Sequence, residues 1–141
     1  MTTDYYPTFL EITSTPGDEV HNASVDGRSI TSLLRDPTET LNRDLYWHYP
    51  HYHAGGDSPY SAIRSADWRL VEFHEDQRVE LYNLADDLGE RHDLAAANPE
   101  QVSKLRDRLH LWQKQVGAQM PVPNPMHDPV RATKVSRTVR K

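Results

Sequence analysis

The sequence of 141 residues contains no cysteine. This absence excludes disulfide bonds, thiolate catalysis and zinc sites built on cysteine. Long apolar runs are also missing, because no stretch of 18 apolar residues occurs, and the N-terminus lacks a basic segment followed by an apolar one. The sequence therefore predicts no membrane-spanning helix and no export signal.

Apolar residues are scarce and prolines are frequent. Hydrophobic residues make up 36% of the chain, which contains ten prolines, and the mean hydropathy is -0.81. Such a composition supports one modest domain with a thin core, or a part of something larger.

Acidic residues are missing from the last segment of the chain. Residues 130–141 carry five basic residues and no acidic one, which leaves 11 basic against 21 acidic residues in the rest of the chain. A short basic tail of this kind is most often solvated and disordered. A nucleic-acid-binding arm is the alternative, and the acidic body argues against it.

The densest group of chemically active side chains lies between residues 46 and 53. These eight positions hold three histidines, three tyrosines and a tryptophan, and Gly55-Gly56 follows. Burying this run would require hydrogen-bond partners for every imidazole and phenol. We therefore interpret it as the wall of a binding site, with five candidate contact residues: His48, Tyr49, His51, Tyr52 and His53.

Two other interpretations of this run stay open. An aromatic run before a glycine turn is also typical of an edge strand that caps a core. The spacing of His48, His51 and His53 could instead serve a metal such as zinc, copper or nickel. Pro50 disfavours the metal site, because it breaks any helix that would align the three imidazoles.

The N-terminal part of the chain predicts helices and the middle predicts strands. Residues 3–13 form a helical pattern with Tyr5, Phe9 and Ile12 on one face, and residues 30–34 form a short helix. Three segments with strand character follow, at 61–65, 68–74 and 79–84, and the last of them alternates between apolar and polar residues. They predict an antiparallel meander.

A long amphipathic helix is predicted over residues 99–116. Asn98 is placed to cap it, Pro99 occupies its first position and Gly117 ends it. One stripe is apolar and needs a sheet to cover; it consists of Val102, Leu105, Leu109, Trp112 and Val116.

Several motifs, in order, resemble the latter part of a type I, arylsulfatase-like sulfatase. They are Thr3-Asp4-Tyr5-Tyr6-Pro7-Thr8, Val25-Asp26-Gly27-Arg28-Ser29, Trp47-His48-Tyr49-Pro50-His51, Ala62-Ile63-Arg64 with Asp67-Trp68-Arg69-Leu70, and Glu80-Leu81-Tyr82-Asn83-Leu84 with Asp87-Leu88-Gly89-Glu90. The resemblance implies an α+β chain: the end of a large α/β domain related to alkaline phosphatase, then a small subdomain in which one long C-terminal helix packs on an antiparallel sheet of about four strands. We expect residues 1–44 to close the large domain, 45–118 to form the subdomain, and 119–141 to be a disordered tail.

The resemblance also implies a chemistry, the hydrolysis of a sulfate ester. In this family a formylglycine, made from the Cys or Ser of a C/S-x-P-x-R motif, is the nucleophile, and calcium polarises the sulfate. The chain departs from that pattern, since Ser14-Thr15-Pro16-Gly17-Asp18 has Asp in place of the arginine. We therefore expect this chain to carry neither the nucleophile nor the calcium ligands, and to be inactive alone.

Three roles remain for the chain. The first is to complete the sulfatase fold and form a wall of the cleft for a sulfated carbohydrate or aryl sulfate ester, with the N-terminal sulfatase domain as partner. The second is a stand-alone binding module for sulfated ligands, and the third an inactive, truncated relic. If the chain belongs to an exported sulfatase, the resemblance implies a periplasmic or secreted location.

Overall fold

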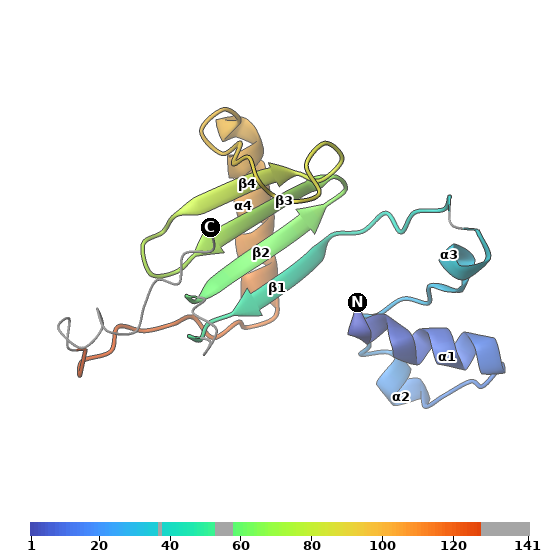
Figure 1. The fold of residues 1–141 in the computed structure, drawn as a ribbon. Helices are drawn as coiled ribbons and strands as arrows, with labels where there is room; N and C mark the ends of the chain where they lie inside the picture. The colour runs from blue at the N-terminus through green and yellow to red at the C-terminus, as the bar shows by residue number, and fades with distance from the viewer. Residues whose placement is uncertain (37, 53–57, 128–141) are drawn as a thin grey trace. The chain divides into compact units, whose positions relative to one another are not determined.

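The computed structural model describes residues 1–36, 38–52 and 58–127. Contacts divide the chain into two units, Met1–Asn42 and Arg43–Lys141. Figure 1 shows the helices of the first unit in blue and the sheet of the second in green. The two units differ in the contacts that stabilise them.

The first unit is held together mainly by polar contacts. It contains a 3-10 turn, Thr2–Asp4, and three helices, α1 (Tyr5–Thr13), α2 (Glu19–Asn22) and α3 (Thr31–Arg35). The buried carboxylate of Asp4 accepts hydrogen bonds from the N-terminal ammonium at 2.6 Å and from the backbone N–H of Arg28 at 3.0 Å. The hydroxyl of Thr8 accepts from the N–H of Ile30 at 3.0 Å. These bonds tie α1 to the segment that leads into α3.

The predicted apolar face of α1 is exposed. The exposed fractions of Tyr5, Phe9 and Ile12 are 55%, 61% and 57%. Monomeric proteins rarely leave such a contiguous stripe open to water. The helical spacing of these residues is as predicted, and the stripe that they form is open to water.

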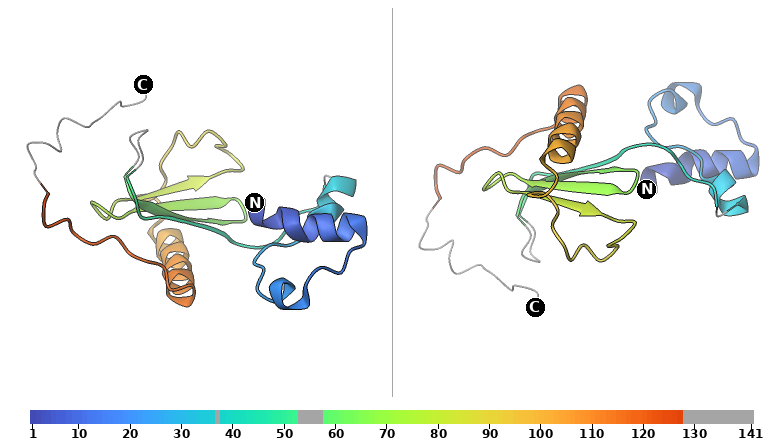
Figure 2. Two further views of the ribbon diagram at one scale, coloured as in Figure 1. Left: turned by 90° about the horizontal axis from the view of Figure 1, so that it is seen from below. Right: turned by 90° about the horizontal axis from the view of Figure 1, so that it is seen from above.

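The second unit is a sheet with one helix across it. Strands β1 (Leu45–Tyr49), β2 (Tyr60–Ser65), β3 (Trp68–Phe73) and β4 (Val79–Asn83) form a four-stranded sheet in the order β1-β2-β3-β4. All neighbours are antiparallel. Helix α4 (Pro99–Gln115) crosses one face of the sheet, as Figures 1 and 2 show. The predicted α+β fold, with its antiparallel sheet and long C-terminal helix, is confirmed.

The core lies between α4 and the sheet. Because side chains alternate along a strand, one register row places Tyr46, Ile63, Leu70 and Leu81 on the same face. Leu105 and Leu109 of α4 pack on this row and are fully buried. Fully burying an aliphatic side chain stabilises by about 1.5–3 kcal/mol before chain entropy is counted. The predicted stripe of α4 is thus largely correct, although Val116 at its end is 53% exposed.

Helix α4 begins at Pro99, as predicted, and ends at Gln115, one residue before the predicted end, but the expected side-chain cap is absent. Asn98 precedes the helix, but its side chain makes no capping bond. Its amide instead donates to the carbonyl of Leu94 at 3.1 Å, which fixes the loop before the helix. Gly117 follows the helix with a φ of +61°, a conformation that glycine adopts without strain. No helix within the described ranges is long and apolar enough to cross a membrane.

Candidate functional site

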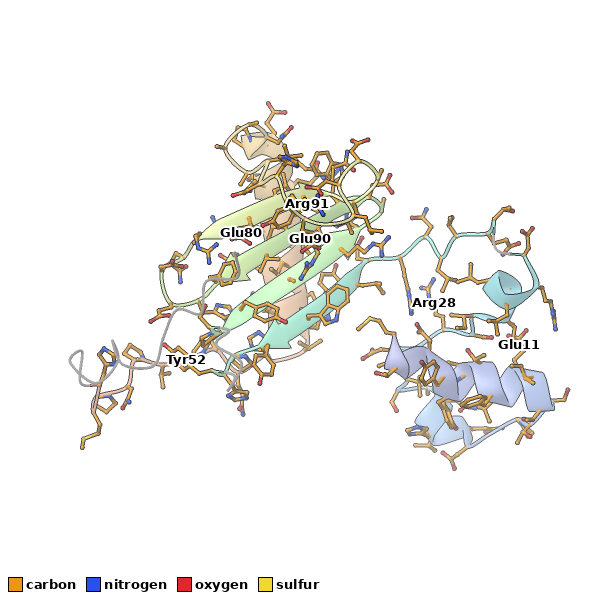
Figure 3. The ribbon with its side chains drawn as sticks, viewed as in Figure 1. Glu11, Arg28, Tyr52, Glu80, Glu90 and Arg91 are labelled. Atoms are coloured by element: carbon orange, nitrogen blue, oxygen red, sulfur yellow. The ribbon has the colours of Figure 1, made fainter. Side chains whose placement is uncertain are left out.

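The predicted wall residues begin at the edge of the sheet. β1 is an edge strand, so the edge-strand interpretation is correct for Leu45–Tyr49. Pro50 ends the strand, and His51 and Tyr52 follow with exposed side chains. Figure 3 labels Tyr52, which is 70% exposed, beyond the end of β1. His53 lies outside the described residues.

His48 faces the side of the sheet that α4 covers. Its Nδ1 lies 2.7 Å from the hydroxyl of Ser61, and its Nε2 lies 2.9 Å from the carbonyl oxygen of Gln119. Both ring nitrogens therefore have partners within the chain. His48 is positioned to hold the end of β1 in place.

Tyr49 lies on the opposite, helix-free face, where aromatic rings form a row across the strands. The ring of His51 meets Tyr49 edge-on at 5.8 Å between centroids. Tyr60 lies 6.1 Å from Tyr49, and Phe73 lies 6.4 Å from Tyr60. The guanidinium of Arg78 stands 3.8 Å above the Phe73 ring. The wall residues at the end of β1 thus adjoin an aromatic row formed by Tyr49, Tyr60 and Phe73.

Ser61 is the centre of a polar cluster on the helix side. Its side chain is fully buried, and its register partners are His48 on β1 and Glu72 on β3. Besides His48, its hydroxyl contacts Nε2 of His74 at 2.9 Å and accepts from the amide of Gln113 at 2.9 Å. The sequence analysis missed this cluster. The available signal was Ser61 itself, a polar residue at an inward position of a strand.

Glu72 holds α4 to the same part of the sheet. Its carboxylate accepts from Arg106 at 2.6 Å and 3.2 Å and is bonded to Nε2 of His110 at 2.6 Å. Burial alone would raise the pKa of Glu72, but the hydrogen bonds from Arg106 and His110 outweigh it and hold the pKa below its usual value. The carboxylate is therefore an ionised anchor for the helix.

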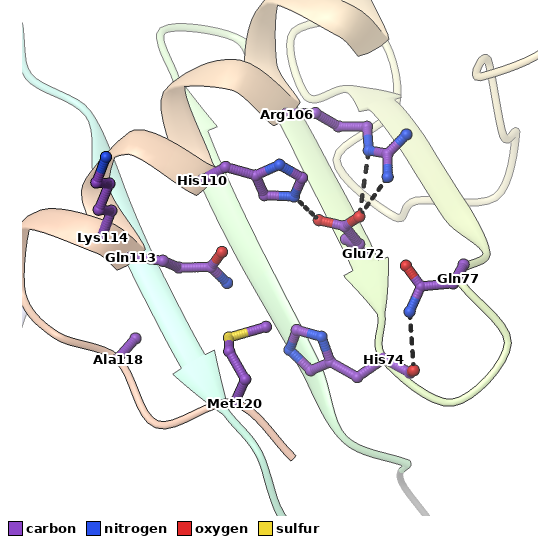
Figure 4. Close-up of a pocket in the computed structure, with 9 residues that line it drawn as sticks. All are labelled: Glu72, His74, Gln77, Arg106, His110, Gln113, Lys114, Ala118 and Met120. Atoms are coloured by element: carbon purple, nitrogen blue, oxygen red, sulfur yellow. Dashed lines mark hydrogen bonds and ion pairs between the residues drawn. The ribbon is translucent and has the colours of Figure 1, made fainter. Parts of the chain in front are cut away.

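A pocket of about 410 Å³ opens beside this anchor, as Figure 4 shows. Its lining includes Glu72, His74, Arg106 and His110. Burial, then the nearby imidazole of His48, lowers the pKa of His74, while Glu72 acts in the opposite direction. His74 is thus kept neutral more strongly than an exposed histidine.

A serine bonded to histidines can suggest nucleophilic catalysis. Ser61, however, is fully buried beneath α4, and its hydroxyl already has three partners. A nucleophile has to reach the reacting atom of a substrate. The cluster therefore has a structural role: its hydrogen bonds hold β1 in place.

The described residues offer no calcium site. Calcium takes six to eight oxygen ligands, mainly from carboxylates and carbonyls. Among residues 1–36, 38–52 and 58–127, no group of three or more His, Asp or Glu side chains is arranged to hold a metal ion. The acidic residues near the site, such as Glu72, are already paired with basic side chains.

Comparison with known proteins identifies the family. The family described as N-sulphoglucosamine sulphohydrolase, C-terminal, matches residues 1–117. A protein described as a sulfatase, from Formosa agariphila, is 36% identical over 123 residues, which cover 79% of this chain and 22% of the relative. The chain thus spans about a fifth of that protein's length.

Solved structures share the fold. BT4656, in complex with its substrate D-glucosamine-2-N,6-O-disulfate, is 25% identical with a TM-score of 0.64, over 84% of this chain and 24% of its own. Ps i-CgsB, in complex with k-i-k-neocarrahexaose, is 20% identical with a TM-score of 0.62, over 92% of this chain and 26% of its own. The sheet and helix described above, the sulfatase relatives and the family match over residues 1–117 agree: the chain belongs to the family of C-terminal sulfatase regions named for N-sulphoglucosamine sulphohydrolase.

Proposed function

We propose that this chain is the C-terminal portion of a sulfatase, which completes the fold of a catalytic domain and forms one wall of its substrate cleft. The family match and the coverage of about a quarter of each related chain support this role. In this proposal the formylglycine nucleophile and the calcium ligands belong to the remaining part of the enzyme. The chain alone does not hydrolyse sulfate esters.

The observation that carries the proposal is the exposed segment at the end of β1. His51 and Tyr52 are exposed and Tyr49 is half-buried, and all three carry rings with hydrogen-bonding tips; His53, which is next in sequence, lies outside the described residues. Tyrosine rings can stack on the apolar face of a sugar, and imidazole and phenol groups can donate to sulfate oxygens. In the proposed wall these four residues contact the substrate, while His48 holds the strand behind them.

A sulfated carbohydrate is the substrate class that we assign. BT4656 is 25% identical to this chain, and its substrate is a glucosamine that carries N- and O-sulfate groups. The aromatic row beside the wall provides additional surface for a sugar ring.

A chimera tests the role of the chain. In BT4656, the C-terminal region that matches this chain would be replaced by the full chain, and hydrolysis of D-glucosamine-2-N,6-O-disulfate would be measured. The exchange should retain activity. His51→Ala and Tyr52→Ala should each lower kcat/KM more than tenfold, which corresponds to about 1.4 kcal/mol.

His92→Ala is the matched control, because the His92 side chain is 79% exposed and lies in the loop before α4. It should leave kcat/KM unchanged. An unchanged kcat/KM in both wall variants would contradict the wall assignment.

The exposed wall also supports a second candidate, a stand-alone module that binds sulfated ligands. Calorimetry of the full chain with glucosamine-2-N,6-O-disulfate distinguishes the two roles. Binding by the chain alone, together with an inactive chimera, would favour the binding module.

A further inference from the structure

We propose that Ser61 and His74 are positioning residues for the wall at the end of β1, and that the cluster around Ser61 accepts one added proton but not two. The importance of the wall for substrates rests on the proposed function. The behaviour of the cluster itself follows from its hydrogen bonds and does not depend on that function.

The bonding capacity of the Ser61 hydroxyl limits how its neighbours can be protonated. Ser61 can donate one hydrogen bond and accept two. One accepted bond comes from the amide of Gln113. One donor position and one acceptor position of Ser61 remain for the two imidazoles, His48 and His74. One of them must therefore donate to Ser61, and the other must accept from it.

The carbonyl of Gln119 determines which imidazole donates to Ser61 and which accepts from it. A carbonyl oxygen only accepts, so Nε2 of His48 carries the hydrogen of their 2.9 Å contact. In neutral His48 the Nδ1 is then bare and accepts from Ser61. His74 has to donate through its Nε2–H. With both rings neutral, the geometry thus assigns the Nε2–H tautomer to both histidines.

One added proton fits this arrangement. A proton on Nδ1 of His74 leaves every bond to Ser61 unchanged. A proton on Nδ1 of His48 makes that ring a donor, whereupon Ser61 rotates to donate to His74 and the hydrogen of His74 moves to Nδ1. Either histidine can therefore be charged while all three contacts of Ser61 persist.

A second proton does not fit. His48, His74 and Gln113 would then present three donors to the two acceptor sites of Ser61, and the serine proton would have no acceptor. The two charged rings would also stand 5.6 Å apart between centroids. The other titratable groups that line the same pocket are Glu72, Arg106, His110 and Lys114. Glu72 does not relieve the conflict, since its carboxylate is bonded to Arg106 and His110.

Loss of a hydrogen bond to Ser61 affects the wall because the wall residues follow His48 directly in the chain. Tyr49 directly follows His48, and the bond between His48 and Ser61 is the side-chain anchor at the end of the edge strand. When the second proton breaks this bond, the His48 side chain keeps only its contact with Gln119, and the position of residues 49–52 shifts. Ser61 and His74 thus position the wall without touching a ligand.

Nuclear magnetic resonance of the full chain labelled uniformly with ¹⁵N tests the proposal. His48→Gln and His74→Gln assign the two signals. Above neutral pH, both rings should show the Nε2–H pattern. On acidification, the second protonation should shift the amide signals of Tyr49 and His51.

The variants provide the matched comparison. In His48→Gln, the titration midpoint of His74 should rise by about one pH unit, because a like-charged neighbour is removed. His51→Gln is the same substitution at an exposed position and should leave that midpoint unchanged.

A neutral Nδ1–H tautomer of His48 or His74 in the unsubstituted chain would overturn the proposal. So would an unchanged His74 midpoint in His48→Gln, or amide signals of Tyr49 and His51 that ignore the second proton. The tautomers are read from the unsubstituted chain, so the test holds even if a variant fails to fold. No ligand is involved, so failure of the proposed function would leave these results standing.

Discussion

The indole of Trp112 on α4 stacks on the phenol ring of Tyr46 on β1, with centroids 4.8 Å apart and ring planes 6° from parallel. This pair extends the helix packing beyond the aliphatic core to the edge strand. Aromatic pairs contribute about 0.5–1.5 kcal/mol beyond their buried area. The edge strand is therefore attached to α4 by an apolar contact as well as by the polar cluster at its other end.

Replacing Trp112 by Ala should lower the free energy of unfolding by about 3 kcal/mol, since the substitution removes a partly buried indole and its stacking contact with Tyr46. Urea titration followed by circular dichroism measures this loss. Leu111→Ala is the control, because Leu111 is 57% exposed on the same helix. Equal losses in both variants would show that the stack does not stabilise the unit.

Replacing Glu72 by Gln should destabilise the second unit by about 2 kcal/mol. The amide cannot pair with the charge of Arg106, and the carboxylate it replaces is 4% exposed. The same urea titration applies, with Asp107→Asn on the exposed side of α4 as control. A Glu72→Gln chain as stable as the Asp107→Asn chain would contradict the anchoring role.

Acid should destabilise the second unit in two steps. The pKa of His74 is lowered on folding, chiefly by burial, so folding favours its neutral form, and this contribution declines as the pH falls from 6.5 through the lowered value. The pKa of Glu72 is also lowered, because bonds to Arg106 and His110 outweigh burial, so its contribution declines as the pH falls below 4.5.

Urea midpoints measured between about pH 8 and pH 4 should therefore decrease as the solution becomes more acidic. In a His74→Gln chain the decrease beginning near pH 6.5 should become smaller, while the decrease below 4.5 should persist. A midpoint that rises on acidification would contradict both assignments.

The exposed stripe of α1 should make the isolated chain bind hydrophobic dyes. Phe9→Ser should reduce the fluorescence of bound 8-anilinonaphthalene-1-sulfonate and reduce self-association in sedimentation velocity, because Phe9 is 61% exposed. Thr15→Ser, an exposed position after α1, is the control. Equal dye fluorescence in both variants would show that the dye binds elsewhere.

The spacing of apolar residues was enough to predict α1, three of the strands and α4. Leu105 and Leu109 recur at a helical interval and are buried. Leu70 and Leu81 lie in two of the predicted strands and pair with each other in the sheet. Apolar residues that recur at a helical or strand period mark the side chains that become buried. This pattern can be read from a short stretch of sequence.

The polar cluster could not be predicted in the same way. Ser61, His74 and Gln113 come from different segments, and only the pairing of strands and the position of α4 bring them together. Asn98 illustrates a second limit, since the carbonyl of Leu94 captured the side chain that was expected to cap α4. Hydrogen-bond partners depend on competition in the folded chain, which a pattern of residue types does not report.

The contact between His48 and the carbonyl of Gln119 joins positions 71 residues apart. The family match ends at residue 117, two positions before this carbonyl. A ribosome that has finished β1 through β4 and even α4 has therefore not yet supplied the last partner of His48. Edge strand β1 is made first among the strands, yet its side-chain anchoring is completed last, and a chain cut at Gly117 would fold with the His48 side chain bonded to Ser61 alone.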